Sequence, residues 1–252
     1  MLLGALAISL VINLLLFAAA FRLKSDKLTD ASYALSFLAV DAYLYSKSAS
    51  SAKAIVALMI AIWAIRIGAF LIYRIIKSGK DKRFDGVRER FFTFARFWVG
   101  QAVTVWVLMI PLGLTVHASK LRLLSVIGPL IWAAGLIIET LADVQKYRFR
   151  GRLENKDKWI STGLWRFSRH PNYFGEILIW VGVYVFLYPS LDPAERLIAF
   201  LSPLTIAFLL IFVTGIPPLE KSGQAKWGKI AAYKAYCART SLLIPLPTKH
   251  KP

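Results

Sequence analysis

Seven mostly apolar stretches constrain the fold of this chain more than any other feature, although the second and sixth are short for a perpendicular crossing and could be tilted, re-entrant or packed inside the bundle. They cover residues 2–21, 31–45, 54–73, 97–116, 121–141, 173–188 and 197–216. Because 57% of the 252 residues are hydrophobic, a soluble fold of this size could not bury so much apolar side chain. Within a bilayer the backbone must satisfy its own hydrogen bonds, and stretches of about 20 residues suit helices. The sequence therefore predicts a single all-α domain, a polytopic membrane bundle of about seven transmembrane helices.

The positive charge of the chain is unevenly placed along it. There are 32 Lys and Arg against 14 Asp and Glu, which gives a formal net charge of +18. Bases gather in residues 74–96, in residues 142–170 and in the tail from 219, whereas 189–196 carries two acids and one base. By the positive-inside rule we expect residue 1 outside, Pro252 in the cytoplasm and membrane lipids as partners. The bases are dispersed among spans rather than collected in a soluble module, which argues against nucleic acid as a partner.

The first stretch reads as a retained span, because it lacks a basic n-region and no A-x-A-like cleavage site follows it. Cys237 is the single cysteine, so no disulfide is expected within the chain. The three histidines, His117, His170 and His250, lie far apart in sequence and do not indicate a metal site.

A basic turn leads into the sixth span and is the first candidate site. The bases of this turn are Arg166, Arg169 and His170. Pro171 suits the first position of the helix, where its missing N–H costs nothing. The free N–H groups of that helix end and the neighbouring bases predict a phosphate cradle. Asn172 and Glu176 share a helix face, and a charge inside an apolar span indicates function. This pattern predicts a phosphate-bearing cofactor whose reactive end reaches into the bilayer.

A polar stripe precedes this turn, on a helix predicted to continue from the fifth span to about Arg150. No Gly or Pro interrupts that helix before Gly151. The stripe consists of Glu139, Asp143, Lys146 and Arg150. Steps of four, three and four place these side chains on one face, where they could hold a ribose, an amide and a phosphate in turn. A solvated face with i,i+4 ion pairs would explain the same spacing.

Further polar residues could contribute to a site. Residues 230–239 predict a short amphipathic helix over the cytoplasmic mouth. As a lid this helix would supply Tyr233, Tyr236 and Arg239 to a cofactor, and otherwise it is an interfacial anchor. Asp85 and Arg88 are a candidate pair in the loop 77–96. Within the spans, Asp41, Arg66 and Gln101 must face the bundle interior. No G-x-G-x-x-G or G-x-x-x-x-G-K-[ST] motif occurs, so a nucleotide would be held in another way.

Residues 163–176 closely resemble the C-terminal signature of the steroid 5α-reductase superfamily, and in particular the branch with Ser-Arg-His-Pro-Asn-Tyr-Phe-Gly-Glu. The resemblance covers roughly residues 74–245. It implies a seven-helix membrane reductase that uses NADPH to saturate a carbon–carbon double bond conjugated to a carbonyl in a steroid-like or other lipid. The resemblance assigns cofactor binding to Asp143, Arg150, Asn172 and Glu176, and by extension to Arg169, His170 and Tyr233. Residues 74–252 would then be the cofactor-binding part.

The N-terminal half departs from the steroid-active relatives, which hold the substrate ketone with a Gln-Glu pair and a Tyr. No Glu precedes Glu89 in this chain. Possible substitutes are Asp30, Tyr33, Asp41 and Tyr43. We expect residues 1–73 to form the substrate side, and we name Glu176, Asp30 and Tyr33 as catalytic candidates.

A second hypothesis is a membrane methyltransferase that uses S-adenosylmethionine. The isoprenylcysteine carboxyl and phospholipid methyltransferases also contain an Arg-His-Pro turn before a Tyr-bearing helix, and an acid after a Pro near the last span. That acid would be Glu220 here. Their motif generally lacks the Asn and Glu found together at Asn172 and Glu176, so the reductase is the first hypothesis. A non-enzymatic scaffold would leave the acids within the spans unexplained.

Overall fold

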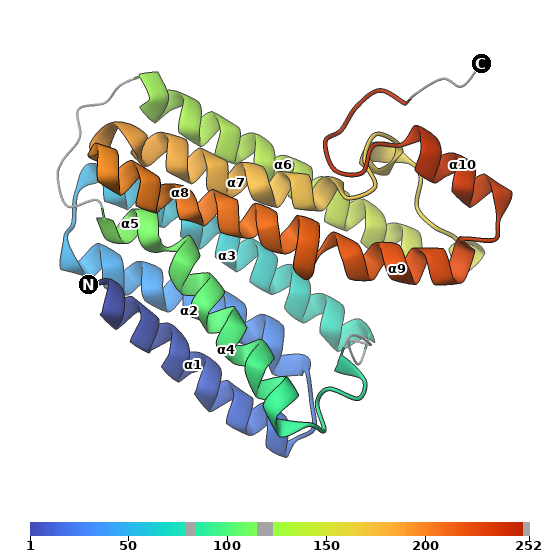
Figure 1. The fold of residues 1–252 in the computed structure, drawn as a ribbon, viewed down its shortest axis with the longest axis horizontal. Helices are drawn as coiled ribbons and strands as arrows, with labels where there is room; N and C mark the ends of the chain where they lie inside the picture. The colour runs from blue at the N-terminus through green and yellow to red at the C-terminus, as the bar shows by residue number, and fades with distance from the viewer. Residues whose placement is uncertain (79–83, 115–122, 249–252) are drawn as a thin grey trace. The chain divides into compact units, whose positions relative to one another are not determined.

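The computed structural model describes residues 1–78, 84–114 and 123–248, and these residues are mostly helical (Figure 1). The helices are α1 (Leu2–Arg22), α2 (Lys27–Lys47), α3 (Ser51–Ser78), α4 (Phe91–Leu108), α5 (Ile110–Leu114), α6 (Leu123–Arg150), α7 (Pro171–Leu187), α8 (Pro193–Phe208), α9 (Ile216–Trp227) and α10 (Ala231–Arg239). Shorter turns lie at Leu153–Asn155, Gly163–Arg166 and Tyr188–Ser190, and a π-helical turn at Leu209–Val213 joins α8 to α9. Within these ranges no strand forms, which confirms the predicted all-α fold.

Six helical stretches among the described residues are long and apolar enough to cross a membrane, so the chain is a multi-pass integral membrane protein. They are Leu2–Arg22, Ser51–Lys77, Phe91–Leu108, Leu123–Arg150, Pro171–Ser190 and Pro193–Trp227. The helix α2 has 21 residues but is much less apolar, since it includes Lys27, Asp30, Asp41 and Lys47. A seventh crossing through α2 therefore stays a prediction, as does the sidedness of the termini. Residues 115–116 and 121–122 of two predicted spans, residues 79–83 of the basic loop, and His117 and His250 lie outside the described residues.

Contacts within the chain divide it into two compact units. Unit 1 comprises Met1–Ser125 and Val183–Ser202, and unit 2 comprises Val126–Gly182 and Pro203–Pro252. All predicted cofactor-binding residues belong to unit 2, whereas the catalytic candidates Asp30 and Tyr33 belong to unit 1. The expected division into residues 1–73 and 74–252 concerns function and stays a prediction.

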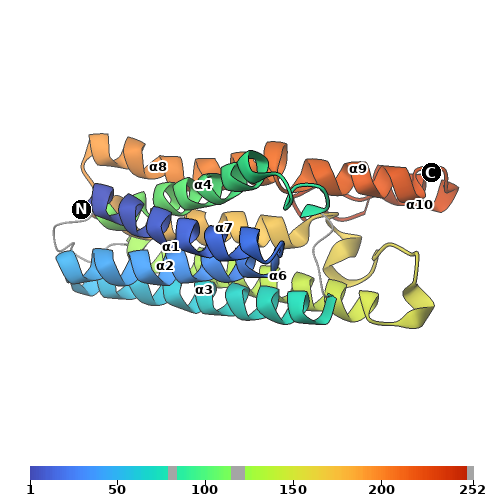
Figure 2. The ribbon, with the colours of Figure 1, turned by 90° about the horizontal axis from the view of Figure 1, so that it is seen from below.

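In unit 1, α2 packs against both α1 and α3, and α4 packs against α1 (Figures 1 and 2). A buried polar network joins three of these helices. The Gln101 Nε2 group donates to Asn13 Oδ1 at 2.9 Å and to Ser32 Oγ at 2.6 Å, and Asn13 Nδ2 donates to Ser36 Oγ at 2.9 Å. Asp41 is only 5% exposed. Polar side chains on membrane helices find partners on neighbouring helices, and the inward orientation predicted for Gln101 and Asp41 is confirmed.

In unit 2, α6 and α7 come so close that glycine is required between them. A Cβ atom added at Gly175 would lie 2.6 Å from the backbone nitrogen of Glu139. One added at Gly182 would lie 2.6 Å from the backbone nitrogen of Trp132. Small residues allow membrane helices to approach in this way. The contact places Glu139 of the α6 stripe directly against the first turns of α7.

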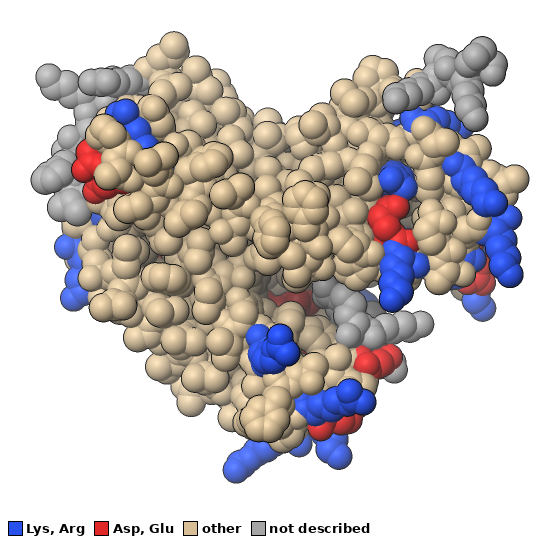
Figure 3. Space-filling model, viewed as in Figure 1, with Lys and Arg blue, Asp and Glu red and all other residues tan. Residues whose placement is uncertain are grey.

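Three local predictions in unit 2 are confirmed. The helix α6 continues to Arg150, α7 begins at Pro171, and α10 spans Ala231–Arg239. Lys and Arg side chains gather over α9 and α10, whereas the surface over α8 beyond its first turn is uncharged (Figure 3). Apolar helices and charged ends suit the bilayer and its interface respectively.

Candidate functional site

The site of unit 2 is built on a loop that is held against α6. The indole Nε1 of Trp165 donates to the carbonyl of Ala142 at 3.0 Å, and the backbone nitrogen of Leu164 donates to Gln145 Oε1 at 2.9 Å. Gly163 has a φ of +60°, and a Cβ atom there would lie 2.5 Å from Gln145 Oε1. Glycine adopts such a backbone without strain, which lets the loop dock closely on α6.

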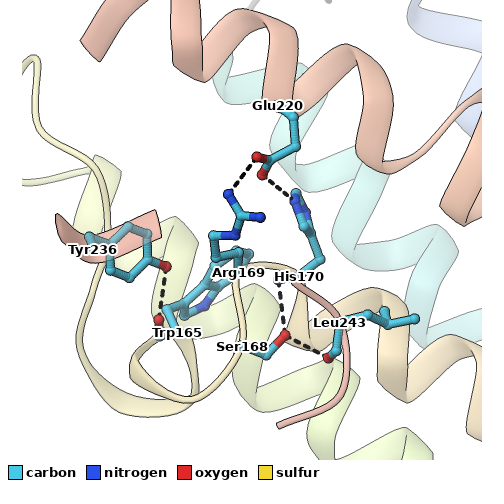
Figure 4. Close-up of polar contacts among 7 residues, drawn as sticks. All are labelled: Trp165, Ser168, Arg169, His170, Glu220, Tyr236 and Leu243. Carbon is cyan, nitrogen blue, oxygen red and sulfur yellow. Dashed lines mark hydrogen bonds and ion pairs between the residues drawn. The ribbon is translucent and has the colours of Figure 1, made fainter. Parts of the chain in front are cut away.

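The C-terminal segment folds back onto the same loop. The hydroxyl of Ser168 donates to the carbonyl of Leu243 at 2.6 Å (Figure 4). The backbone nitrogen of Arg169 donates to the carbonyl of Ser241 at 2.8 Å. The backbone nitrogen of His170 donates to Ser168 Oγ at 3.1 Å. Ser168 thus connects the end of the chain to the residues that start α7.

A charged cluster joins this turn to α9. The carboxylate of Glu220 accepts from Arg169 Nη1 at 2.7 Å and contacts His170 Nε2 at 2.8 Å (Figure 4). The His170 side chain is 5% exposed and that of Glu220 is 25% exposed. Glu220 was absent from the residues predicted for a reductase. The sequence feature that points to Glu220 is its position after Pro217 and Pro218, on which the methyltransferase hypothesis is based.

Burial decides the protonation state of His170. Burial lowers the pKa of the imidazole below its ordinary value of 6.5, and the hydrogen bond that the ring donates to Glu220 opposes this shift only in part. Near neutral pH the ring is therefore neutral, and an Nε2–H donating to Glu220 leaves a lone pair on Nδ1. The Nδ1 atom is buried and has no hydrogen-bond partner among the described residues. The ring stacks on Tyr173 with a centroid distance of 5.6 Å.

Two more buried polar atoms near the start of α7 lack partners among the described residues. They are Asn172 Oδ1 and Arg169 Nε. Buried polar atoms in proteins are nearly always hydrogen-bonded, and an unpaired one costs about 1–3 kcal/mol. Together with His170 Nδ1, these atoms mark the first turn of α7 as a place where a ligand or water would supply partners.

The stripe on α6 runs from the protein interior to the surface. Glu139 is 2% exposed and Asp143 is 8% exposed, so the solvated-face interpretation does not hold for its first half. Lys146 Nζ lies 4.4 Å from the centroid of the Trp165 ring, and Arg150 is exposed. Glu176 is partly buried on α7. The stripe therefore presents buried acids beside α7 and bases toward water.

The tyrosines of α10 attach this helix to the loop. Both Tyr233 and Tyr236 are buried, and Tyr236 donates its hydroxyl to the carbonyl of Trp165 at 2.9 Å. Tyr233 packs edge-on against Trp159 at 5.1 Å. Burial raises the pKa of Tyr233 to about 12 and also raises that of Tyr236, so both hydroxyls stay protonated at neutral pH.

A hollow of about 820 Å³ lies between the loop and α10. Its lining residues are Ser161, Thr162, Gly163, Arg166, Ala235, Tyr236, Ala238, Arg239, Thr240 and Thr248. The three bases of the predicted cradle consequently divide between two places. Arg166 lines this hollow with Arg239, whereas Arg169 and His170 contact Glu220.

The catalytic candidates of unit 1 have partners of their own. Asp30 Oδ2 lies 3.4 Å from Arg74 Nη2, and Tyr33 packs edge-on against Phe37 with a centroid distance of 4.9 Å. The predicted pair of Asp85 and Arg88 forms an ion pair at 2.6 Å.

These features define a polytopic helical membrane protein with a polar site where its α6 and α7 helices meet a basic loop. The chain belongs to the DUF1295 family, described as a protein of unknown function, whose model matches residues 16–240. No curated protein and no solved structure matches the chain.

Proposed function

We propose that this protein is an integral membrane reductase that uses NADPH to saturate a carbon–carbon double bond conjugated to a carbonyl in a steroid-like or other lipid. One observation carries the proposal. At the start of α7, His170 and Asn172 hold buried polar atoms that have no partners among the described residues, directly beside a helix that buries Glu139 and Asp143.

The donor and acceptor types of these residues suit a dinucleotide. Asn172 Oδ1 is an acceptor, and the carboxamide of a nicotinamide ring carries two N–H donors. The buried carboxylates of α6 would accept hydrogen bonds from ribose hydroxyls, and Arg150 at the exposed end would suit a phosphate. Bound NADPH would supply a hydride to the β-carbon of the substrate, while a proton from water or an acid completes the α-carbon.

The chain must also stabilise the enolate that such a reduction forms on the substrate. A hydrogen-bond donor to the carbonyl oxygen does this. Asp30 contacts Arg74 Nη2 through its Oδ2 atom at 3.4 Å, so this carboxylate already has a basic partner. The side chain of Tyr33 carries a phenolic O–H donor and is therefore the better of the two candidates. Glu176 on α7 is the candidate closest in sequence to the cofactor-binding turn.

The test is a calorimetric titration of the purified protein in detergent with NADPH, NADH and S-adenosylmethionine. We expect NADPH to bind more tightly than NADH, because the bases around the site suit the additional 2′-phosphate. Binding of S-adenosylmethionine without any response to NADPH would refute the reductase.

A second candidate function is methyl transfer from S-adenosylmethionine, and one contact favours it. Glu220 occupies the position of the acid found after a Pro near the last span of the membrane methyltransferases, and it bonds to both Arg169 and His170. We rank it second, since it leaves the pair of Asn172 and Glu176 without a role.

A further inference from the structure

Arg166 and Arg239 line the same hollow and lack acidic partners within the described part of the chain. Neither forms an ion pair with a described carboxylate, and no described residue lining the hollow is acidic. Two other arginines of the same unit differ in this respect. Arg169 is paired with Glu220, and Arg152 is paired with Glu154.

Two guanidinium groups facing one hollow repel each other unless an anion lies between them. Each guanidinium presents a planar fork of donors that matches a phosphate group. Arg239 is the last residue of α10, so the negative end of the helix dipole offsets part of its charge. That end carries only about half an elementary charge, which leaves a net positive hollow.

The remaining lining suits a small polar ligand. Ser161, Thr162 and Thr248, which carry hydroxyl groups, line the hollow together with Gly163. A volume of about 820 Å³ lies within the range of small-molecule sites, roughly 300–1,000 Å³. Tyr236 contributes a ring whose hydroxyl is already bonded to the Trp165 carbonyl. Such a ring can pack against a nucleobase or a ribose without needing another partner.

We propose that this hollow binds a phosphate monoester through Arg166 and Arg239. The identity of that monoester rests on the proposed function, under which it is the 2′-phosphate of NADPH. An anionic lipid with a phosphate monoester headgroup presents the same chemistry and is the alternative source. Under this proposal Arg166 and Arg239 bind the phosphate, whereas the cluster of Arg169, His170 and Glu220 does not.

The experiment uses the full chain in detergent and three probes. Adenosine 2′,5′-bisphosphate and adenosine 5′-monophosphate differ only in the 2′-phosphate, and dihexanoyl phosphatidic acid represents the lipid. Binding is measured by calorimetry for the parent and for the variants Arg166→Gln, Arg239→Gln and Arg152→Gln. The last is the matched control, because it removes the same charge from a surface side chain that is 70% exposed. All four proteins are first compared by thermal unfolding, since the two lining arginines are exposed and their replacement should leave folding intact.

We expect the parent to prefer the bisphosphate, and each lining variant to bind it roughly 10- to 100-fold more weakly, as expected for the loss of a hydrogen bond to a charged group. The control variant should match the parent. Unchanged binding of both the bisphosphate and the phosphatidic acid in the lining variants would overturn the site, while NADPH titration would still test the reductase separately. Arginine-dependent binding of phosphatidic acid alone would support the monoester site and overturn its assignment to the cofactor.

Discussion

At the scale of single residues, the amide of Asn172 offers the most direct test of the site. Its Oδ1 atom is buried without a described partner at the start of α7. If a cofactor supplies the partner, Asn172→Ala should weaken NADPH binding by about 1–3 kcal/mol, the usual cost of leaving a buried group unsatisfied. The affinity is measured by calorimetry beside the melting temperature in detergent. Equal NADPH affinity in the variant and the parent would remove Asn172 from the site.

The protonation of His170 predicts a pH dependence of stability. The folded protein holds the pKa of His170 below its ordinary value of 6.5, so the unfolded chain takes up a proton first as the pH falls. Stability is then lost on acidification below about pH 6.5. We expect the melting temperature to fall more in the parent than in His170→Gln between about pH 7.5 and about pH 5.5. A parallel decrease in both proteins would show that other groups cause the dependence.

At the scale of helices, the contact between α6 and α7 depends on a missing side chain. In Gly175→Ala the new Cβ atom would meet the backbone of α6 at 2.6 Å, where nothing flexible can move aside. We expect the two helices to separate, with a loss of about 1–3 kcal/mol of stability and weaker NADPH binding. Gly100→Ala in α4 is the matched control, because no atom lies within 4 Å of its added Cβ. Thermal unfolding of both variants checks this, and a stable Gly175→Ala protein would contradict the close contact.

Local signals made much of unit 2 predictable. Pro171 marked the start of α7, and the absence of Gly and Pro before Gly151 gave the length of α6. The spacing of Glu139 and Asp143 gave their common face, but not their burial. Contacts between segments far apart in the sequence could not be predicted from the periodicity of polar and apolar residues. The bond from Ser168 to Leu243 and the bond from Arg169 to Glu220 depend on how the chain folds back. Because Arg169 bonds to Glu220, it does not line the same hollow as Arg166, as the predicted phosphate cradle required.

At the scale of the whole molecule, the number of crossings determines where the ends of the chain lie. Seven crossings would put the N-terminus outside, the C-terminus in the cytoplasm and residues 189–196 outside. Single cysteines in a Cys237→Ser background test this with a membrane-impermeant label. Exposed positions such as Leu3, Ala194 and Ser222 are suitable. We expect labelling from outside at Leu3→Cys and Ala194→Cys and none at Ser222→Cys. Labelling of Leu3→Cys and Ser222→Cys from the same side would show an even number of crossings. In that case α2 would not cross the membrane.

The pairing between the loop and the tail has a consequence for the order of events during synthesis. Ser168 and Leu243 are 75 residues apart, and the backbone nitrogen of Leu246 also donates to the carbonyl of Phe167. A ribosome releases the chain from its N-terminus, so the loop that contains Ser168 reaches the membrane surface long before the C-terminal segment that pairs with it has been made. The hydrogen bonds between the loop and the tail can therefore form only after the helices α7, α8 and α9 have been synthesised. The assembly of the polar site is one of the last steps in making the protein.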